Sequence, residues 1–205
     1  MSAKANDSKQ RILATAIDLI KEKGYNSVTL NDICATANVS KNTFYYYFKS
    51  KEDLLIHFYG IPTNKIKMNL ASILMEEVNI EQYWKLIEPM LDFIVDNGPE
   101  IIKNMIYALI NQHMLEVQPS KFGLPNSDVV NTIIKRAQSS NEIRNSSDPV
   151  LLANAIRAQV LGIILFWCTE NGEFDLKNEI RLILEVCFDV KPELRKATTN
   201  TYSKT

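Results

Sequence analysis

The chain has 205 residues, of which 46% are hydrophobic and 23% are charged, so it can bury a substantial core. Its seven prolines and six glycines are too few for a disordered chain or a β-sandwich. The net charge of −1 excludes a protein that is basic as a whole, so nucleic-acid binding would depend on where charges are placed.

The first predicted element is an amphipathic helix from Asp7 to Lys23, where apolar residues recur at helical spacing. Gly24 ends this helix, because glycine readily adopts the left-handed conformation of a C′ residue. Thr29 then caps a second helix, and Asp32 three residues later forms a capping-box-like pair with it. The chain therefore begins with two helices separated by a short connection.

The stretch from Ser40 to Leu54 predicts a turn, a short aromatic helix and the start of a fourth helix. Ser40 is a good N-cap, and a helix beginning there places Phe44 and Phe48 on one face, toward a core. The lysine, amide and phenol groups of the other faces then point outward, where they can contact phosphates and base edges. Three helices with a tight turn between the last two form a helix-turn-helix, whose last helix enters the major groove.

The rest of the chain predicts further helices and no alternating pattern typical of a strand. Gly60 to Pro62 is expected to kink or interrupt the fourth helix. Gly98-Pro99 separates two later helices, and further helices are expected at 129–139, 149–170 and 174–190. The predicted fold is all-α: a helix-turn-helix DNA-binding domain at 1–55, a larger ligand-binding and dimerisation domain at 56–190, and a disordered tail at 191–205.

The last two predicted helices each have more than one apolar face. Such helices suit a four-helix contact between two identical copies, although one large monomeric core would give the same pattern. Gly162 would allow the helices to approach closely there. The predicted dimer interface consists of Leu161, Gly162, Leu165, Ile180, Ile183, Leu184 and Cys187.

Motifs for catalysis, cofactor binding or metal binding are absent from the sequence. The three cysteines lie far apart in apolar helical patterns, which indicates buried thiols. The first residues are polar and charged, unlike a signal peptide, and the longest uncharged segment, Ala158 to Thr169, is shorter than the ~18 residues of a membrane span. We therefore expect a cytoplasmic protein with no cofactor, no metal and no membrane partner.

The N-terminal quarter of the chain resembles the TetR family of bacterial transcriptional regulators. The resemblance lies in Gly24-Tyr25, Val28-Thr29, Ile33 to Ala35, Ala37 to Lys41, Thr43 to Phe48 and Lys51 to Leu54. Two positions differ from the family pattern: Asn42 stands where glycine is common, and Phe44 stands where leucine is usual. The resemblance implies a DNA-binding head, a body that encloses an effector pocket, and a homodimer formed by the last two long helices.

Helical facing and the family motif together predict the DNA contacts. Base edges should be read by Lys41, Asn42, Thr43 and Tyr45, and phosphates held by Thr29, Tyr46, Tyr47 and Lys51. Asn31 and Ser40 complete the predicted DNA-binding set. Three consecutive tyrosines cannot all face one core, so at least one phenol must lie outside.

The effector is predicted to be a small apolar or aromatic molecule, because the body helices carry large apolar groups with few polar partners. A lipophilic cation would also suit tyrosine and tryptophan faces. The candidate lining residues are Tyr83, Trp84, Met90, Phe93, Tyr107, His113, Met114 and Trp167, and a dry core would give the same pattern.

The function predicted from the sequence is a ligand-responsive, homodimeric transcriptional regulator that represses genes from a palindromic DNA operator. One alternative is a regulator or chromosome-organising factor of the same fold without an effector. A more remote alternative is an all-α enzyme, which would need catalytic groups that the sequence does not arrange.

Overall fold

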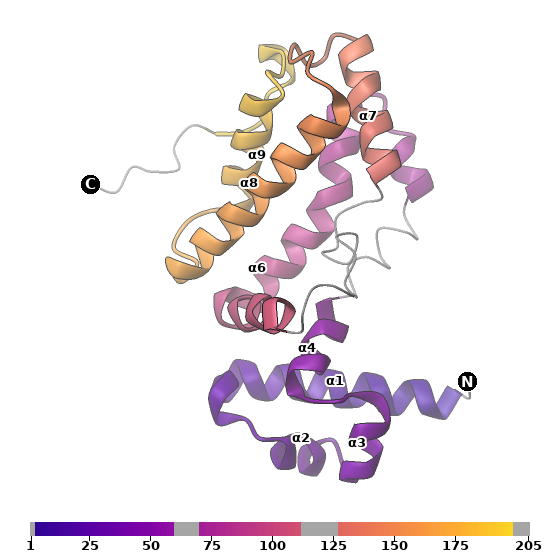
Figure 1. The fold of residues 1–205 in the computed structure, drawn as a ribbon, viewed down its shortest axis with the longest axis vertical. Coiled ribbons are helices and arrows are strands. Elements are labelled where there is room, and N and C mark those ends of the chain that lie inside the picture. The colour runs from indigo at the N-terminus through magenta and orange to yellow at the C-terminus, as the bar shows by residue number, and fades with distance from the viewer. Residues whose placement is uncertain (1–2, 60–69, 112–126, 199–205) are drawn as a thin grey trace. The chain divides into compact units, whose positions relative to one another are not determined.

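The structure, a computed structural model, describes residues 3–59, 70–111 and 127–198 (Figure 1). Apart from one isolated β-bridge, the regular secondary structure in these ranges is helical. An isolated antiparallel bridge joins Ile143 to Val190. The predicted all-α fold is confirmed. The helices are α1 (Ala3–Lys23), η1 (Tyr25–Ser27), α2 (Leu30–Thr36), α3 (Lys41–Tyr47), α4 (Lys51–Tyr59), α6 (Asn79–Asn111), α7 (Ser127–Ser139), α8 (Pro149–Thr169), α9 (Leu176–Cys187) and η3 (Pro192–Leu194).

The chain divides into two compact units. One comprises Met1–Ile61 together with Glu100–Glu116, and the other comprises Pro62–Pro99 together with Val117–Thr205. The sequence predicted a DNA-binding domain at 1–55, a body at 56–190 and a tail at 191–205, and these bounds stay a prediction. By its contacts, the second part of α6 groups with the N-terminal unit, a long-range association that has no signature in local sequence.

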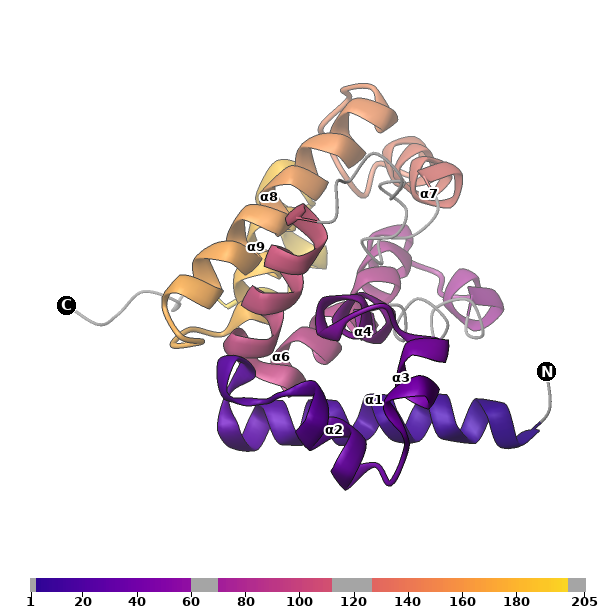
Figure 2. The same cartoon turned by 60° about the horizontal axis from the view of Figure 1, so that its bottom comes forward.

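The N-terminal unit is built on the apolar stripe of α1. Ile12, Ala16 and Ile20 are fully buried, as are Phe44 and Phe48 from the α3 region. Helix α1 packs against α2, and α2 lies beside α3 across the turn that joins them (Figures 1 and 2). Burial of one face of each short helix provides most of the free energy that holds them.

In the second unit α8 packs against both α7 and α9 (Figures 1 and 2). Asp148 caps α8 by accepting from the amides of Val150 and Leu151, and Asp175 caps α9 by accepting from the amide of Asn178. Both helices begin and end within a few residues of the predicted positions. The buried core of this unit takes residues from each helix, including Ile87, Leu91, Ile133, Ile156, Val160, Ile180 and Leu184.

Helix α6 is two helical segments joined at Gly98, whose φ of 77° and ψ of 165° are non-helical. This break was predicted from Gly98-Pro99. Pro89, which was expected to allow a kink, lies inside the first segment, where the backbone dihedrals remain helical. The predicted interruption at Gly60 to Pro62 lies outside the described residues.

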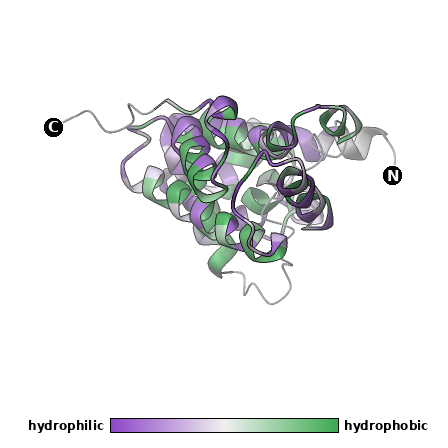
Figure 3. Cartoon of the chain, turned by 90° about the horizontal axis from the view of Figure 1, so that it is seen from above, coloured by the Kyte–Doolittle hydropathy of each residue, from purple (hydrophilic) through white to green (hydrophobic). Residues whose placement is uncertain are grey.

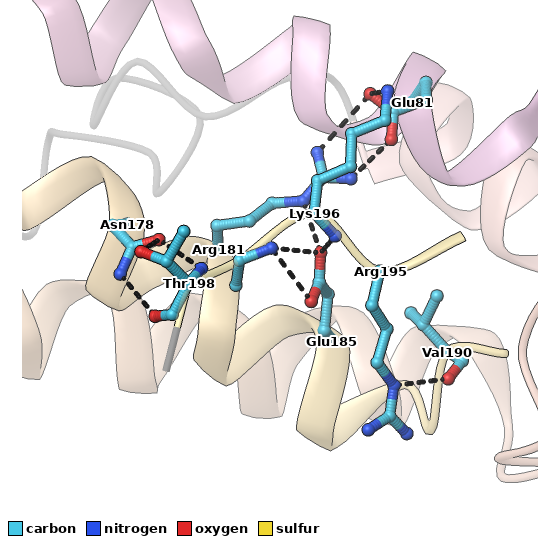
Figure 4. Close-up of polar contacts among 9 residues, drawn as sticks. Glu81, Asn178, Arg181, Glu185, Val190, Arg195, Lys196 and Thr198 are labelled. Carbon is cyan, nitrogen blue, oxygen red and sulfur yellow. Dashed lines mark hydrogen bonds and ion pairs between the residues drawn. The ribbon is translucent and has the colours of Figure 1, made fainter. Parts of the chain in front are cut away.

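A buried network of charges connects α6, α9 and the C-terminal segment (Figure 4). Arg181 on α9 pairs with Glu81 on α6 and, one turn along its own helix, donates from Nε to Glu185 at 2.8 Å. Lys196 adds an ion pair to Glu81 at 3.0 Å. Burial opposes ionisation of Glu81, but its hydrogen bonds and charge pairing with Arg181 and Lys196 outweigh burial and lower its pKa.

The C-terminal segment is ordered across α9 up to residue 198, whereas the sequence predicted disorder from residue 191. The Glu185 carboxylate accepts from the backbone amides of Lys196 and Ala197. Asn178 both donates to the backbone carbonyl of Thr198 and accepts from its amide (Figure 4). The prediction failed because the α9 side chains bind the tail through its main chain, so the polar composition of the tail did not reveal the contact.

Hydrophobic and hydrophilic residues alternate along the helices (Figure 3). Helix α8 has the length and composition of a membrane span, and 33% of its apolar stretch is buried inside the chain. Core helices of soluble proteins meet the same criterion, so the composition of α8 is weak evidence for a membrane.

We predict that Arg181→Met destabilises the body, because Glu81 and Glu185 would lose the guanidinium that compensates them. The free energy of unfolding should fall by about 3–5 kcal/mol. The matched control is Lys177→Met, which removes half-exposed ion pairs between α9 and two carboxylates of α6 and should cost about 0–1 kcal/mol. Urea denaturation of the two variants measures the difference, and equal losses would contradict the role assigned to the buried network.

Candidate nucleic-acid interface

The helix-turn-helix begins with a capped α2. The Thr29 hydroxyl accepts from the amide of Asp32 at 3.2 Å, and the Asp32 carboxylate accepts from the amide of Thr29 at 2.8 Å. This is the capping box predicted from the sequence. The hydrogen bonds from Thr29 lower the pKa of Asp32, so the carboxylate stays ionised. Both amides at the start of α2 are thereby satisfied within the protein.

The turn between α2 and α3 is fixed by its own residues. Asn38 adopts a left-handed conformation with φ of 51°, which asparagine tolerates better than most residues. Ser40 then caps α3, because its Oγ accepts from the amide of Thr43 at 3.1 Å and lies 2.9 Å from the Thr43 hydroxyl. The predicted cap and start of α3 are confirmed, and the turn sets the direction in which α3 leaves α2.

Helix α3 has one buried face and one open face. Phe44 and Phe48 are fully buried and their ring centroids lie 5.6 Å apart. Tyr45 is 57% exposed and Tyr46 is 74% exposed, so two phenols remain on the surface. The predicted contact residues that are exposed are Thr29, Asn31, Ser40, Lys41, Asn42, Tyr45 and Tyr46, while Thr43, Tyr47 and Lys51 are half-buried.

The exposed α3 face is chemically suited to duplex DNA. Lys41 carries a positive charge, the Asn42 amide can both donate and accept, and a phenol can do the same. These groups match the donors and acceptors of base edges in the major groove and the oxygens of phosphates. The exposed aromatic residues on this helix are held by their neighbours: Tyr46 meets Tyr47 edge-on with 4.8 Å between ring centroids.

Lys51, which the sequence predicted to hold a phosphate, is half-buried and donates to two main-chain carbonyls of its own unit. Its Nζ donates to the carbonyl of Tyr25 at 2.6 Å and to that of Val28 at 2.8 Å. The ammonium also lies 3.9 Å from the centroid of the Tyr25 ring. Partial burial lowers the pKa of Lys51, which the charge of Glu52 opposes. Lys51 therefore fastens the connection between α1 and α2 to the start of α4.

Tyr25 is the centre of this connection, and the sequence analysis did not identify that role. Its hydroxyl donates to Glu52 at 2.9 Å, and its amide donates to Glu100 at 2.9 Å. Burial and the Glu52 carboxylate raise the pKa of Tyr25, so the phenol stays protonated. The Gly-aromatic pair at Gly24-Tyr25 was the available signal, but neither acidic partner could be located without the fold.

Arg11 is a second residue that the sequence analysis missed. Its Nε donates to the carbonyl of Ala37 at 3.0 Å, which ties α1 to the C-terminal end of α2. The contact spans 26 positions in the chain, so no local pattern announces it. The turn of the helix-turn-helix is therefore supported from α1 as well as by Ser40.

The predicted effector residues are mainly engaged in core contacts. Tyr83 is buried and meets Phe188 edge-on with 5.1 Å between ring centroids, and burial raises the pKa of Tyr83. The Trp84 ring lies 5.0 Å from the guanidinium carbon of Arg181. Tyr107 is exposed and belongs to the N-terminal unit. Met90 and Trp167 are buried, Phe93 is half-buried, and His113 and Met114 lie outside the described residues.

The predicted dimer residues separate into two groups. Ile180 and Leu184 are buried within the protomer, so their side chains contribute to its own core. Leu161 and Leu165 are 38% and 43% exposed, while Ile183 and Cys187 are half-buried. Nothing lies within 4 Å of a Cβ built on Gly162, which leaves open space beside it. Exposed apolar positions on α8 and α9 that the prediction omitted are Val150, Leu151, Phe166 and Val186.

Among the described residues no group of three or more histidine, cysteine, aspartate or glutamate side chains could hold a metal ion.

Comparison with known proteins finds similarity in the N-terminal part of the sequence and, for solved structures, over most of the fold. The family described as bacterial regulatory proteins, tetR family, matches residues 12–58. An uncharacterised HTH-type transcriptional regulator of Bacillus subtilis, YerO, is 39% identical over 66 residues, which cover 30% of this chain and 23% of that protein. This match is confined to a minority of both chains.

Two solved structures resemble the chain over most of its length. SmeT, the repressor of a multidrug efflux pump of Stenotrophomonas maltophilia, has a TM-score of 0.65 at 21% identity and covers 93% of this chain and 94% of its own. FadR of Bacillus subtilis, solved with stearoyl-CoA, has a TM-score of 0.61 at 20% identity and covers 87% and 97%. At these identities the likeness concerns the fold.

We predict that Lys51→Met destabilises the N-terminal unit, because the carbonyls of Tyr25 and Val28 would lose their donor. The free energy of unfolding should fall by about 1–2 kcal/mol. Lys49→Met is the matched control, since Lys49 is exposed and two residues away, and should change stability by less than about 0.5 kcal/mol. Chemical denaturation followed by circular dichroism compares the variants, and a Lys51 variant as stable as wild type would refute the structural role.

Proposed function

Because this chain belongs to the TetR family of bacterial regulatory proteins, we propose that it is a homodimeric repressor that releases its DNA operator when a small effector binds. Membership of the family makes the chain a soluble transcriptional regulator and not an enzyme. Beyond family membership, we propose four further points: repression, a DNA operator, a small effector and a cytoplasmic location.

The observation that carries the proposal is the open face of α3. The helix is capped by Ser40 and buried through Phe44 and Phe48, so its outer side chains stand on a fixed frame. We propose that Lys41, Asn42, Thr43 and Tyr45 contact base edges and that Thr29, Tyr46 and Tyr47 contact phosphates. Lys51 leaves the phosphate set, because both of its carbonyl partners lie within the protein.

The proposed dimer forms through the exposed apolar residues of α8 and α9. Leu161 and Leu165 lie one turn apart on α8, and Val186 on α9 is 60% exposed. Burying such residues against a second copy is favourable by roughly 25 cal/mol per Å² of apolar surface. The open space beside Gly162 would admit a neighbouring helix. The two recognition helices of a dimer could then bind two half-sites of a palindrome.

The proposed effector is a small, mostly apolar molecule. The body helices bury many apolar side chains, and those predicted as ligand contacts are largely aromatic. Solved structures of similar fold offer two precedents: one is a complex of SmeT with triclosan, and the FadR structure contains stearoyl-CoA. Both molecules have large apolar parts, which agrees with the expectation from the sequence.

The proposed mechanism is a shift in population between two states. A dimer binds a palindrome well only when the spacing of its recognition helices matches successive major grooves. An effector that binds more tightly to a state with another spacing draws the population away from DNA. By linkage, DNA must weaken effector binding by the same factor.

Selection of a duplex from random DNA, followed by gel-shift titration at several salt concentrations, tests the function. Tyr45→Ala should relax the sequence preference by about 1–3 kcal/mol at one or two positions, because a base contact is lost. Lys41→Met should also reduce the salt slope by about one unit, because one cation is removed from the interface. Lys135→Met, an exposed change on α7, is the control and should bind as wild type. Failure of wild type to select any duplex would refute the function.

We predict that Leu165→Glu disrupts the dimer, because a carboxylate in the contact would lack a partner. The variant should still fold, since Leu165 is 43% exposed in the protomer. Val95→Glu on α6 is the matched control, because Val95 is also 43% exposed but lies on another helix. Analytical ultracentrifugation should show monomers only for Leu165→Glu. A dimeric Leu165→Glu protein would place the interface elsewhere.

Thermal-shift measurements with triclosan, stearoyl-CoA, a lipophilic cationic dye and glucose 6-phosphate test the effector class. A ligand that binds the folded state raises the melting temperature in proportion to RT ln(1 + [L]/Kd). At least one apolar compound should raise it and release the selected duplex. Stabilisation by the sugar phosphate with no response to any apolar compound would contradict the proposed class.

A further inference from the structure

We propose that α9 carries a peptide-binding site, and that residues 195–198 are a strap that occupies this site and can leave it while the body stays folded. The strap is irregular in conformation and lies across α9 (Figure 4). The side chains that hold it come from α9 and from the first turn of α6, and all of them belong to one compact unit. The site therefore lies in the body alone and goes beyond the proposed function.

Asn178 binds one residue of the strap through the main chain. Its Nδ2 donates to the carbonyl of Thr198 at 2.9 Å, and its Oδ1 accepts from the amide of Thr198 at 2.8 Å. A residue exchanges the same two bonds with its partner across an antiparallel ladder, so the Asn178 side chain takes the place of a neighbouring strand. The Thr198 hydroxyl adds a contact with Oδ1 at 3.1 Å. Because two of these three contacts are to the main chain, we expect Asn178 to hold other residues at this position as well.

Glu185 continues the site about two turns further along the same face of α9. Its Oε1 accepts from the amide of Lys196 at 2.7 Å and from that of Ala197 at 3.2 Å. Arg181 donates to the same oxygen at 2.8 Å, and only 2% of Glu185 is exposed. Two α9 side chains thereby bind the amides of three successive residues, from 196 to 198.

The charges of the site select a cation. The ammonium of Lys196 lies 3.0 Å from a carboxylate oxygen of Glu81, and Arg181 pairs with both Glu81 and Glu185. With the strap in place, these two carboxylates are balanced by two cations. Without it they would share one guanidinium, and a buried carboxylate that lacks compensation is costly. The ligand class is therefore a peptide that offers successive main-chain amides and a lysine at the first of them.

The strap is held by polar contacts and not by apolar burial. Its residues are exposed, apart from the half-buried Ala197, and Arg195 adds a bond from Nε to the carbonyl of Val190 at 2.8 Å. Ile180 and Leu184 hold α9 in the core independently of the strap, because both are buried. An opening that exposes little apolar surface costs less free energy than global unfolding. We therefore expect the strap to detach while α9 stays in place.

Limited digestion of the full chain with trypsin tests the site. Cleavage after Arg195 or Lys196 requires the strap to leave α9, so its rate, measured by mass spectrometry, follows the population of the open form. Asn178→Ala should raise this rate about tenfold, because two main-chain bonds are lost. Lys177→Met is the matched control, since Lys177 is the adjacent residue on α9 but pairs with carboxylates of α6, and it should be cleaved at the wild-type rate. A wild-type rate in Asn178→Ala would overturn the site.

Two substitutions at Thr198 separate main-chain from side-chain recognition. Thr198→Pro removes the amide that donates to Asn178 and should also raise the cleavage rate about tenfold. Thr198→Ala keeps this amide and should stay within about threefold of wild type. Because Thr198 is exposed, both variants should fold, which circular dichroism checks. Equal release of the strap by both substitutions would contradict recognition through the main chain.

Hydrogen exchange of the full chain tests the charge selection and the detachment. Lys196→Glu should lower the protection of the amides at 196–198 by about tenfold or more, because a third carboxylate would face Glu81 and Glu185. Lys196→Arg keeps the charge and should stay within about threefold of wild type. The amides of Ile180 and Leu184 should exchange as in wild type throughout. A single common exchange rate for the strap and α9 in wild type would refute detachment, and none of these measurements depends on DNA binding.

Discussion

A helix of seven residues makes too few internal hydrogen bonds to be stable alone in water, and α3 is such a helix. Everything that α3 can do for recognition depends on the burial of Phe44 and Phe48 and on the Ser40 cap. This burial consumes one face completely, which is why the polar side chains occupy the other. The α1 helix and the connection around Tyr25 complete this support, so the position of α3 depends on residues of other elements.

The two units solve the same problem of burying polar groups in different ways. In the N-terminal unit, Lys51 donates to two main-chain carbonyls of the connection between α1 and α2. In the body, Glu185 satisfies main-chain amides of the C-terminal segment, and Arg181 compensates its charge. In both places one charged side chain forms hydrogen bonds with main-chain groups of an irregular segment. Each is therefore costly to remove, since a buried polar group without a partner is penalised more than a surface ion pair gains.

Features that depend on neighbours in the chain could be predicted from the sequence. The caps at Thr29 and Ser40, the break at Gly98 and the inward phenylalanines all follow from spacing and residue type. Contacts between distant positions could not be predicted: the partners of Lys51 lie 23 and 26 positions away, and Glu100 lies 75 positions from Tyr25. Where a helix has two apolar faces, the sequence does not tell which face lies in the core of the chain. Ile180 and Leu184 were therefore predicted to contact a second copy, although both are buried within the chain itself.

The inward position of Lys51 has a consequence for how the protein searches a genome. Affinity for random DNA comes almost entirely from cations that displace counterions at phosphates, and this chain has a net charge of −1. With Lys51 bound to carbonyls, the proposed DNA-binding face of α3 keeps the charge of Lys41 and otherwise offers an amide and phenols. We expect such a face to bind random DNA weakly. In the mechanism proposed above, more of the protein would then remain in solution, where a small effector could bind it before it reaches its operator.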